Sequence, residues 1–203
     1  MPLMSSFSPV SCIILSAGDS GRMGMHKALL PFGKLKLTFL EKIIQSYRQA
    51  GINQIVVVVN SGLLRQINDL NLKLPGSVQI VENLHPEKGR FYSLQTGLRY
   101  VKTGSHVFIH NVDNPFIDKR VLKLMLENIN SALVILPAFS GKAGHPVLIP
   151  PDVCELINKS ECLEARIDYF LMDFPSSKIE VNDHGIFANI NTPEDYRKAF
   201  VGF

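Results

Sequence analysis

Five short apolar runs occur along the chain, and their pattern limits the possible folds more than any other feature of the sequence. Each run is bounded by polar, Gly or Pro residues, which is typical of strands buried on both faces. Longer segments with helical spacing lie between them. Strands that alternate with helices form βαβ units and a mostly parallel sheet. The runs are Cys12–Ala17, Ile55–Asn60, Val78–Val81, His106–His110 and Ala132–Leu136.

The sequence therefore predicts a single three-layer α/β/α, Rossmann-like domain around a mixed, mostly parallel sheet that spans residues 1–203. In such sheets ligands bind outside the carboxyl ends of the strands. Gly51 and Asp118 are expected to end and begin helices. Residues 141–151 are rich in Gly and Pro and are predicted to form a loop or a lid. The expected helical stripes are Phe39, Ile43, Ile44 and Tyr47; Leu94, Leu98 and Val101; and Val121, Leu122, Met125 and Ile129.

Composition excludes several classes of protein. The net charge is only +3, without the clustered Lys and Arg residues of a nucleic-acid binder, so no nucleic-acid partner is expected. No apolar run approaches the ~20 residues of a membrane span, so no membrane partner is expected. The three cysteines, Cys12, Cys154 and Cys162, lack Cys-x-x-Cys spacing. Reduced thiols and a cytoplasmic location are therefore expected.

A glycine-rich segment directly follows the first apolar run. Gly18, Gly21 and Gly24 let backbone N–H groups turn inward, and such a nest binds phosphate oxygens. Arg22 and Lys27 supply positive charge for the same ligand. The spacing fits neither a Walker loop nor the Gly-x-Gly-x-x-Gly dinucleotide motif. A phosphate-binding loop is predicted, and the alternative is a glycine-rich turn with two surface cations.

This segment resembles the L-A-A-G-x-S-x-R-M-G-x-x-K-x-L-L-P signature of the molybdopterin nucleotidyltransferases. Ser16 stands where the signature has its first Ala, and the resemblance extends from about Val10 to Phe200. It implies that Arg22 and Lys27 are catalytic and that Leu15, Ala17, Gly18, Ser20, Gly21 and Gly24 bind the nucleotide. The matching residues are Leu15, Ala17, Gly18, Ser20, Arg22, Met23, Gly24, Lys27, Leu29, Leu30 and Pro31, and Gly21 is also placed at the nucleotide.

A second segment, from Gly89 to Leu98, is similar to the family's G-x-x-x-S-L-x-x-G-L segment, which contacts the nucleotide in relatives. The resemblance implies that Gly89 and Ser93 bind the nucleotide. On chemical grounds, Ser93 and Gly89 open a helix whose N–H groups could face an anion. Ser93 as a simple helix N-cap is the alternative.

One acidic residue, Asp113, follows the fourth apolar run. A carboxylate at the end of a buried strand is costly without a partner, and Mg²⁺ prefers oxygen ligands. The resemblance places Asp113 in a metal-binding D-x-P motif, with Asn114 in place of the commoner Gln. The family therefore implies Mg²⁺ as the cofactor. The alternative for Asp113 is a turn residue before Pro115.

Two further segments resemble the family. Gly144 and His145 belong to a G-x-x-G-H-P-V-L segment, which implies a place beside the acceptor; a loop histidine without a ligand is the alternative. Asn189 occupies the first polar position of the N/D-I-N/D-T-P-E-D motif, which completes the metal site in relatives. Thr192 and Pro193 are expected to be the N-cap and first residue of the last helix.

The resemblance thus implies a magnesium-dependent nucleotidyltransferase that moves a nucleotide onto the phosphate of molybdopterin and releases pyrophosphate. Ala17 favours CTP, because guanylyl-transferring relatives tend to carry Gly there. The product implies transient contact with a molybdoenzyme or its chaperone. A sugar- or alcohol-phosphate nucleotidyltransferase is one alternative. Another is a nucleotide-binding accessory protein without catalysis, for which the neutral Asn189 leaves room.

Overall fold

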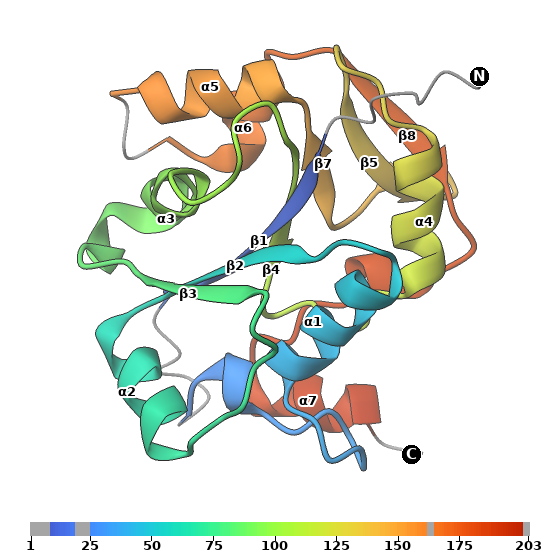
Figure 1. Cartoon of the computed structure of the whole chain (residues 1–203). Coiled ribbons are helices and arrows are strands. Elements are labelled where there is room, and N and C mark those ends of the chain that lie inside the picture. Colours follow the sequence, from blue (N-terminus) through green and yellow to red (C-terminus); the bar gives the residue numbers. More distant parts are fainter. Residues whose placement is uncertain (1–8, 19–24, 162–164, 201–203) are drawn as a thin grey trace, which may run out of the picture.

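The computed structural model of the protein describes residues 9–18, 25–161 and 165–200. Its centre is an eight-stranded sheet in the order β3-β2-β1-β4-β7-β5-β6, with β8 paired to β5 (Figure 1). All five predicted strands are present. The strands are β1 (Val10–Ser16), β2 (Gln54–Val59), β3 (Val78–Glu82), β4 (His106–Asn111), β5 (Val134–Phe139), β6 (Lys142–Ala143), β7 (Val147–Ile149) and β8 (Ser176–Glu180).

Strand direction divides the sheet into two parts. β1 pairs in parallel with both β2 and β4, and β2 pairs in parallel with β3. β7 lies antiparallel between β4 and β5, while β6 is antiparallel and β8 parallel to β5. The sheet is therefore mixed and mostly parallel, and the predicted fold class is confirmed.

The prediction of a loop, or lid, at residues 141–151 is wrong. This segment contains β6 and β7, and all three residues of β7 are buried within the sheet. Pro146 and Pro150 flank β7 rather than interrupt it, so the strand keeps its ladder hydrogen bonds. A run of three apolar residues between prolines gives little local signal. Its partners, β4 and β5, lie elsewhere in the chain.

The three predicted helices are present, although two end before the last apolar residue of their stripes. The Asp118 carboxylate accepts a hydrogen bond from the Arg120 N–H at 2.7 Å, and Gly51 has a φ of 93° just after the first helix. No helix of the described residues is long and apolar enough to cross a bilayer. The helices are α1 (Phe39–Gln49), α2 (Ser61–Asp69), α3 (Gly89–Leu98), α4 (Lys119–Glu127), α5 (Pro151–Lys159), α6 (Ile167–Leu171) and α7 (Pro193–Phe200). The 3-10 helices among the described residues are η2 (Lys27–Leu29), η3 (Pro86–Lys88) and η4 (His184–Phe187).

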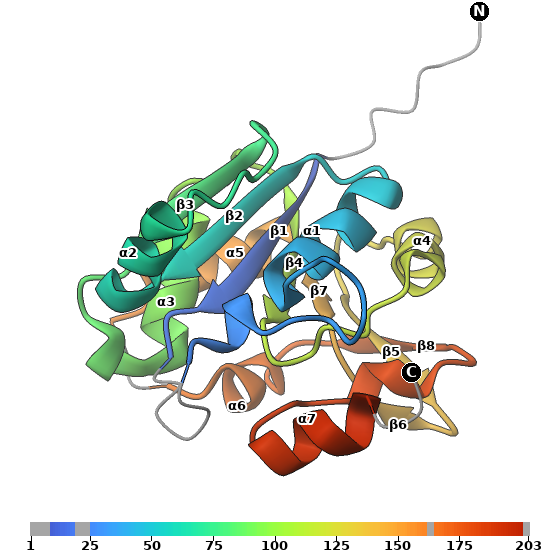
Figure 2. The same ribbon diagram turned by 90° about the horizontal axis from the view of Figure 1, so that it is seen from below.

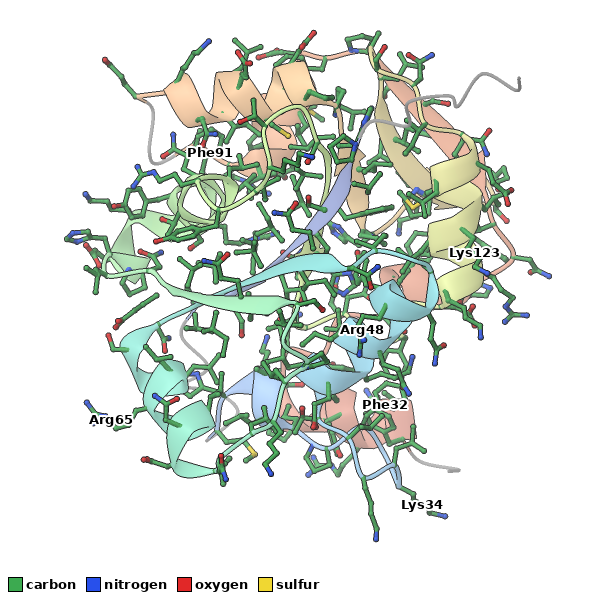
Figure 3. The ribbon with its side chains drawn as sticks, viewed as in Figure 1. Phe32, Lys34, Arg48, Arg65, Phe91 and Lys123 are labelled. Atoms are coloured by element: carbon green, nitrogen blue, oxygen red, sulfur yellow. The ribbon has the colours of Figure 1, made fainter. Side chains whose placement is uncertain are left out.

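Two apolar cores lie on opposite faces of the sheet. Alternate residues of β1 enter different cores: Ile14 packs with α1, α2 and α4, whereas Ile13 packs with α3, α5 and α6. Figure 3 shows Phe91 directed into the second core, where its ring centroid lies 5.1 Å from that of Phe170. A Cβ on Gly97 would lie 2.8 Å from the Ile13 side chain. Glycine at this position therefore lets α3 approach the sheet closely.

The last helix packs against the segment that follows β1. The Tyr196 hydroxyl donates to the Pro31 carbonyl at 2.8 Å, and the Phe200 ring lies 5.2 Å from the Phe32 ring. Figure 2 shows α7 and β6 on the same side of the molecule. Thr192 caps α7 by accepting from the Asp195 N–H, as predicted. This packing brings the segment before α7 to the carboxyl ends of the central strands.

Candidate active site

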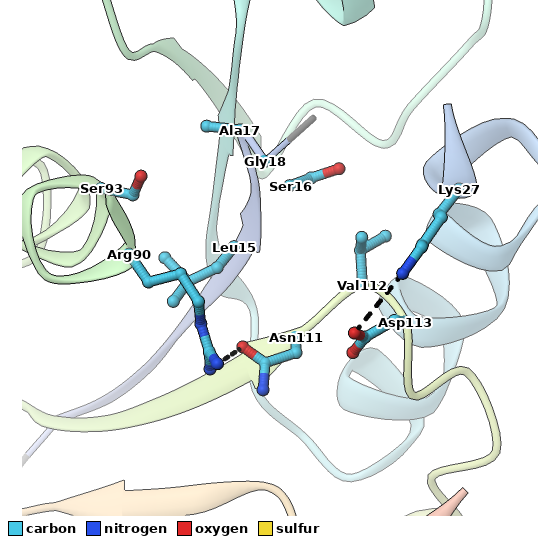
Figure 4. A pocket seen from close by; sticks show the side chains of 10 residues that line it. All are labelled: Leu15, Ser16, Ala17, Gly18, Lys27, Arg90, Ser93, Asn111, Val112 and Asp113. Carbon is cyan, nitrogen blue, oxygen red and sulfur yellow. Dashed lines mark hydrogen bonds and ion pairs between the residues drawn. The ribbon is translucent and has the colours of Figure 1, made fainter. Parts of the chain in front are cut away.

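A polar pocket lies at the carboxyl ends of β1 and β4, where the fold class predicts a ligand site (Figure 4). It brings together six residues predicted from the sequence: Leu15, Ala17, Gly18, Lys27, Ser93 and Asp113. Ser16, Arg90, Asn111 and Val112 complete the lining. The predicted residues Ser20, Gly21, Arg22 and Gly24 lie outside the residues that the structure describes.

Lys27 and Asp113 face each other across this pocket. Lys27 Nζ lies 3.8 Å from Asp113 Oδ2 and donates to Asn191 Oδ1 at 2.7 Å. The two charged side chains are only 14% and 27% exposed. The other carboxylate oxygen, Asp113 Oδ1, is buried and accepts no hydrogen bond within the described structure. A buried oxygen in that state is costly unless a cation or donor reaches it.

The donor set around Asp113 suits Mg²⁺. The Ile190 N–H donates to the Asp113 carbonyl at 2.7 Å, which places the segment 189–191 beside the Asp113 loop. Carboxylate and amide oxygens therefore converge here, and Mg²⁺ commonly takes few protein ligands alongside substrate phosphates. Within the described residues, no group of three or more His, Cys, Asp or Glu side chains could hold a metal ion. A metal at this site would therefore depend on Asp113, on the neutral amide of Asn189 and on ligands from the substrate.

Three asparagines that we did not predict as site residues end the parallel strands next to the pocket. Asn60 Nδ2 donates to the Ala17 carbonyl at 3.2 Å, and Asn83 Nδ2 donates to Ser93 Oγ at 2.9 Å. Asn111 Oδ1 accepts from Arg90 Nη2 at 2.6 Å. These amides fix the surrounding loops without adding negative charge opposite a phosphate. Their regular place at strand ends was visible in the sequence and could have identified them.

The structure corrects one interpretation of Ser93. This residue lies inside α3 rather than at its N-cap, and its hydroxyl donates to the Gly89 carbonyl at 3.1 Å while accepting from Asn83. Gly89 begins the helix with a φ of 84°, a conformation that favours glycine. The N-cap alternative for Ser93 is therefore wrong. Its hydroxyl instead ties the start of α3 to the end of β3.

A buried polar chain supports the turn that carries Asp113. His110 Nε2 donates to the Asn114 carbonyl at 2.8 Å, and Nδ1 accepts from the Tyr47 hydroxyl at 3.0 Å. Complete burial lowers the pKa of His110 to about 3. The imidazole is therefore neutral near pH 7, as these two hydrogen bonds require. Asn114 extends the support, because its Nδ2 donates to the Ile186 carbonyl at 3.3 Å.

A much larger cavity, of about 970 Å³, adjoins the polar pocket and shares Arg90 and Asn111 with it. Three cations, Lys88, Lys142 and Arg166, also line it, and Arg166 is paired with Asp168. Most of its wall is apolar: Ile109, Val134, Leu136, Val147, Ile167, Leu171, Met172, Phe174, Ile186 and Phe187. It therefore has room for a sizeable ligand with an apolar or planar body.

The predicted acceptor residues Gly144 and His145 line this cavity, together with Gly89 and Asn189. A Cβ on Gly144 would lie 2.7 Å from the Ile186 carbonyl oxygen, so Gly144 also serves close packing. The His145 N–H donates to the same carbonyl at 2.9 Å. Burial lowers the pKa of the His145 imidazole, and the charge of Arg90 lowers it further.

Comparison with known proteins identifies relatives along most of the chain. Residues 12–172 match the MobA-like NTP transferase domain. A molybdenum cofactor cytidylyltransferase from Escherichia coli is 27% identical over 192 residues, covering 93% of this chain and 94% of the relative. A probable molybdenum cofactor guanylyltransferase from Carboxydothermus hydrogenoformans is 25% identical over 194 residues, covering 91% and 92%.

Solved structures share the fold. The crystal structure of Rv0371c from Mycobacterium tuberculosis superposes with a TM-score of 0.79 at 20% identity, covering 97% of this chain and all of that chain (100%). A manganese complex of the same protein gives a TM-score of 0.76 at 19% identity, covering 96% and 99%. These solved structures therefore share the fold of this chain over nearly its whole length.

Proposed function

This chain belongs to the MobA-like NTP transferase domain family and is a nucleotidyltransferase; from this premise, we propose that it transfers CMP from CTP to the phosphate of molybdopterin. The observation that carries the proposal is the junction of two unequal sites. A small polar pocket with Lys27 and Asp113 opens beside a large apolar-walled cavity. The first suits a nucleoside triphosphate, and the second suits a phosphorylated acceptor with a ring system.

The reaction needs little acid–base chemistry from the protein. An oxygen of the acceptor phosphate attacks the α-phosphorus of CTP, and the bond from that phosphorus to the β-phosphate bridging oxygen breaks. The electron pair leaves with pyrophosphate. A phosphomonoester is already largely dianionic near neutral pH, because its second pKa is about 6. Catalysis then depends on alignment and on neutralising charge.

The residues divide this work. Lys27, held by Asn191 and beside Asp113, neutralises charge on the triphosphate. Gly18 and the segment after it contact the phosphates, with Arg22 as a second cation. Asp113 and Asn189 would hold Mg²⁺, which when bound neutralises phosphate charge and polarises the reacting phosphoryl group. The buried, unpartnered Asp113 Oδ1 supports this assignment. The buried free thiols of Cys12 and Cys154 support a cytoplasmic setting.

The preference for CTP rests on Ala17. Its side chain is 2% exposed, and Figure 4 shows its methyl group directed toward α3 on the side of Ser93. A methyl group there takes space that a two-ring purine needs, while a one-ring pyrimidine fits beside it. Overpacking by one methyl group typically costs ~1–3 kcal/mol. The Asn60 amide holds the Ala17 carbonyl, so the backbone has little freedom to retreat.

The apolar wall of the cavity favours molybdopterin over a sugar phosphate or an alcohol phosphate. A polyol would leave its hydroxyl groups unpaired against Ile109, Leu136 and Val147. A fused ring system can instead pack on these side chains and keep its polar edge toward His145 and the cations.

Pyrophosphate release by the purified protein tests the proposal. The assay contains Mg²⁺ and either CTP or GTP, with molybdopterin, a sugar phosphate, choline phosphate or no acceptor. We expect release that requires molybdopterin and is faster with CTP. Release with a sugar phosphate or choline phosphate instead would identify another acceptor class. Nucleotide binding without release for any acceptor would indicate an accessory protein that lacks catalysis.

A further inference from the structure

Arg90 occupies the boundary between the polar pocket and the large cavity, and it lines both. It is the second residue of α3, directly after Gly89, whose φ of 84° sets the turn into the helix. Its guanidinium donates from Nη2 to Asn111 Oδ1 at 2.6 Å. Figure 4 shows this group pointing away from Gly18 and toward the end of β4. The side chain is thus aimed at the junction of the two sites.

The guanidinium is oriented but not neutralised. Asn111 is uncharged, and the described structure contains no carboxylate that forms an ion pair with Arg90. The two nearby acids are engaged, because Asp113 faces Lys27 and Asp168 faces Arg166. A guanidinium has five N–H donors, so the bond to Asn111 leaves most of them available. A planar fork of this kind matches the geometry of a phosphate.

His145 lines the same large cavity as Arg90. After burial, the charge of Arg90 is the main cause that lowers the pKa of the His145 imidazole. The imidazole is therefore neutral near pH 7 and carries one N–H that can donate to an anion. Arg90, Asn111 and His145 all line the large cavity. Together they offer hydrogen-bond donors to a dianion where that cavity meets the polar pocket, because Arg90 and Asn111 line both.

We propose that Arg90, oriented by Asn111, binds the phosphate group of the acceptor and holds its attacking oxygen in line with the α-phosphorus. This inference rests on the proposed nucleotidyl transfer. The ligand class is a phosphomonoester dianion, whatever the body of the acceptor. Arg90 is then an acceptor-binding residue, and Asn111 is a positioning residue that acts through it. In this proposal, Lys27 and the glycine-rich segment bind the triphosphate.

The first test measures KM for the acceptor and KM for CTP separately in variants of Arg90. Arg90→Met removes a charge-assisted contact, so KM for the acceptor should rise about 10- to 100-fold while KM for CTP stays within about twofold. Arg90→Lys should be intermediate, because a point charge cannot replace a planar fork. Arg99→Met, which removes the same charge just past the other end of α3, is the control and should leave both constants unchanged. Equal increases for CTP and acceptor in Arg90→Met would overturn the assignment.

Asn111→Asp tests whether acceptor binding needs the net charge of the Arg90 guanidinium as well as its orientation. The carboxylate keeps an oxygen for Arg90 but neutralises the guanidinium, so acceptor KM should rise although the arginine remains held. A purely structural role for Asn111 predicts no such rise in a variant with an unchanged melting temperature.

Methyl phosphate provides a probe that does not depend on the identity of the acceptor. We expect wild type and Arg99→Met to bind it and Arg90→Met to lose that binding, as measured by ³¹P NMR titration. Unchanged binding in Arg90→Met would refute the role of Arg90 even if transfer is observed. If methyl phosphate binding depends on Arg90 but no acceptor is nucleotidylated, the proposed transfer fails and the anion site stands.

Discussion

The sheet has two parts, which we call the parallel side (β1 to β4) and the mixed side (β5 to β8). They differ in strand direction and in the kind of ligand site that they form. On one side, β1, β2, β3 and β4 are parallel, and three of them lead into asparagines that fix the neighbouring loops. On the other side, β7, β5, β6 and β8 mix directions and surround a wide cavity with an apolar wall. The parallel side forms a small polar pocket, and the mixed side forms most of the large cavity.

This difference matches the different requirements of the two proposed substrates, which bind to the same sheet. A triphosphate needs fixed donors and little negative charge, which strand ends capped by neutral amides provide. A bulky acceptor needs space, and the antiparallel β7 between β4 and β5 builds the wall of the large cavity beside the polar pocket. If this division is correct, variants on the parallel side should change chemistry and nucleotide choice, except at Arg90 and Asn111, which line both sites and should change acceptor affinity. Variants on the mixed side should change acceptor affinity.

The largest effect is expected from Asp113→Ala on the parallel side. Losing the proposed metal ligand removes several kcal/mol of charge stabilisation, so kcat should fall by roughly a thousandfold or more. The melting temperature should change little, because the side chain lies at the pocket surface. Asp118→Ala is the matched control: it removes the N-cap of α4 and should cost about 1 kcal/mol of stability while leaving kcat intact. Turnover near wild type in Asp113→Ala with Mg²⁺ would remove Asp113 from the metal site.

Ala17→Gly tests nucleotide choice on the same side. Removing the methyl group should narrow the preference of kcat/KM for CTP over GTP by roughly ten- to a hundredfold, if shape alone sets it. The ratio should be measured with one accepted acceptor in wild type and variant. An unchanged ratio would show that Ala17 is not the discriminating group, and a wild type that favours GTP would reverse the proposed substrate.

Acidification should destabilise the protein through His110, the buried histidine that supports the turn carrying Asp113. The His110 pKa is about 3 in the fold, against an ordinary value of 6.5. Below pH 6.5 the unfolded chain therefore binds a proton that the folded protein excludes, and stability is lost as the pH falls. His110 alone should cost about 2 kcal/mol between about pH 6.5 and pH 5.

Urea unfolding of two histidine variants at both pH values measures this contribution. His110→Gln should reduce the difference in unfolding free energy between the two pH values more than His145→Gln does. His145 also has a lowered pKa, but it lies in the more open cavity on the mixed side. Equal reductions in the two variants would contradict the contrast between the sides.

The smallest effect is expected from Phe187→Ala in the wall of the large cavity. Its ring lines that cavity and lies 5.2 Å from Lys142 Nζ. Losing an aromatic contact worth about 1 kcal/mol should raise acceptor KM roughly fivefold without changing KM for CTP. Tyr169→Ala, at an exposed aromatic residue of α6, is the control and should change neither. A change in KM for CTP alone would mean that the cavity serves the nucleotide.

The sequence by itself determined the parallel side. Buried strands and amphipathic helices carry their period locally, so five strands, three helices and the cap at Asp118 could be predicted from neighbouring residues. The placement of Asp113 and of the segment that leads to Lys27 after strand ends followed from the same order, because the carboxyl ends of parallel strands meet at one edge. The match to the family signature added their proposed roles.

Apart from β5, only the tertiary structure decided the mixed side and the partners within the site. β7 is three residues long and owes its place to β4 and β5, so no local pattern marks it. Lys27 meets Asn191 from 164 positions away in sequence. Arg90 reaches Asn111 only because the close approach at Gly97 seats α3 against β1 and β2. Periodicity reports which face of an element is buried, but not which distant element covers it, and packing over the whole chain makes that choice.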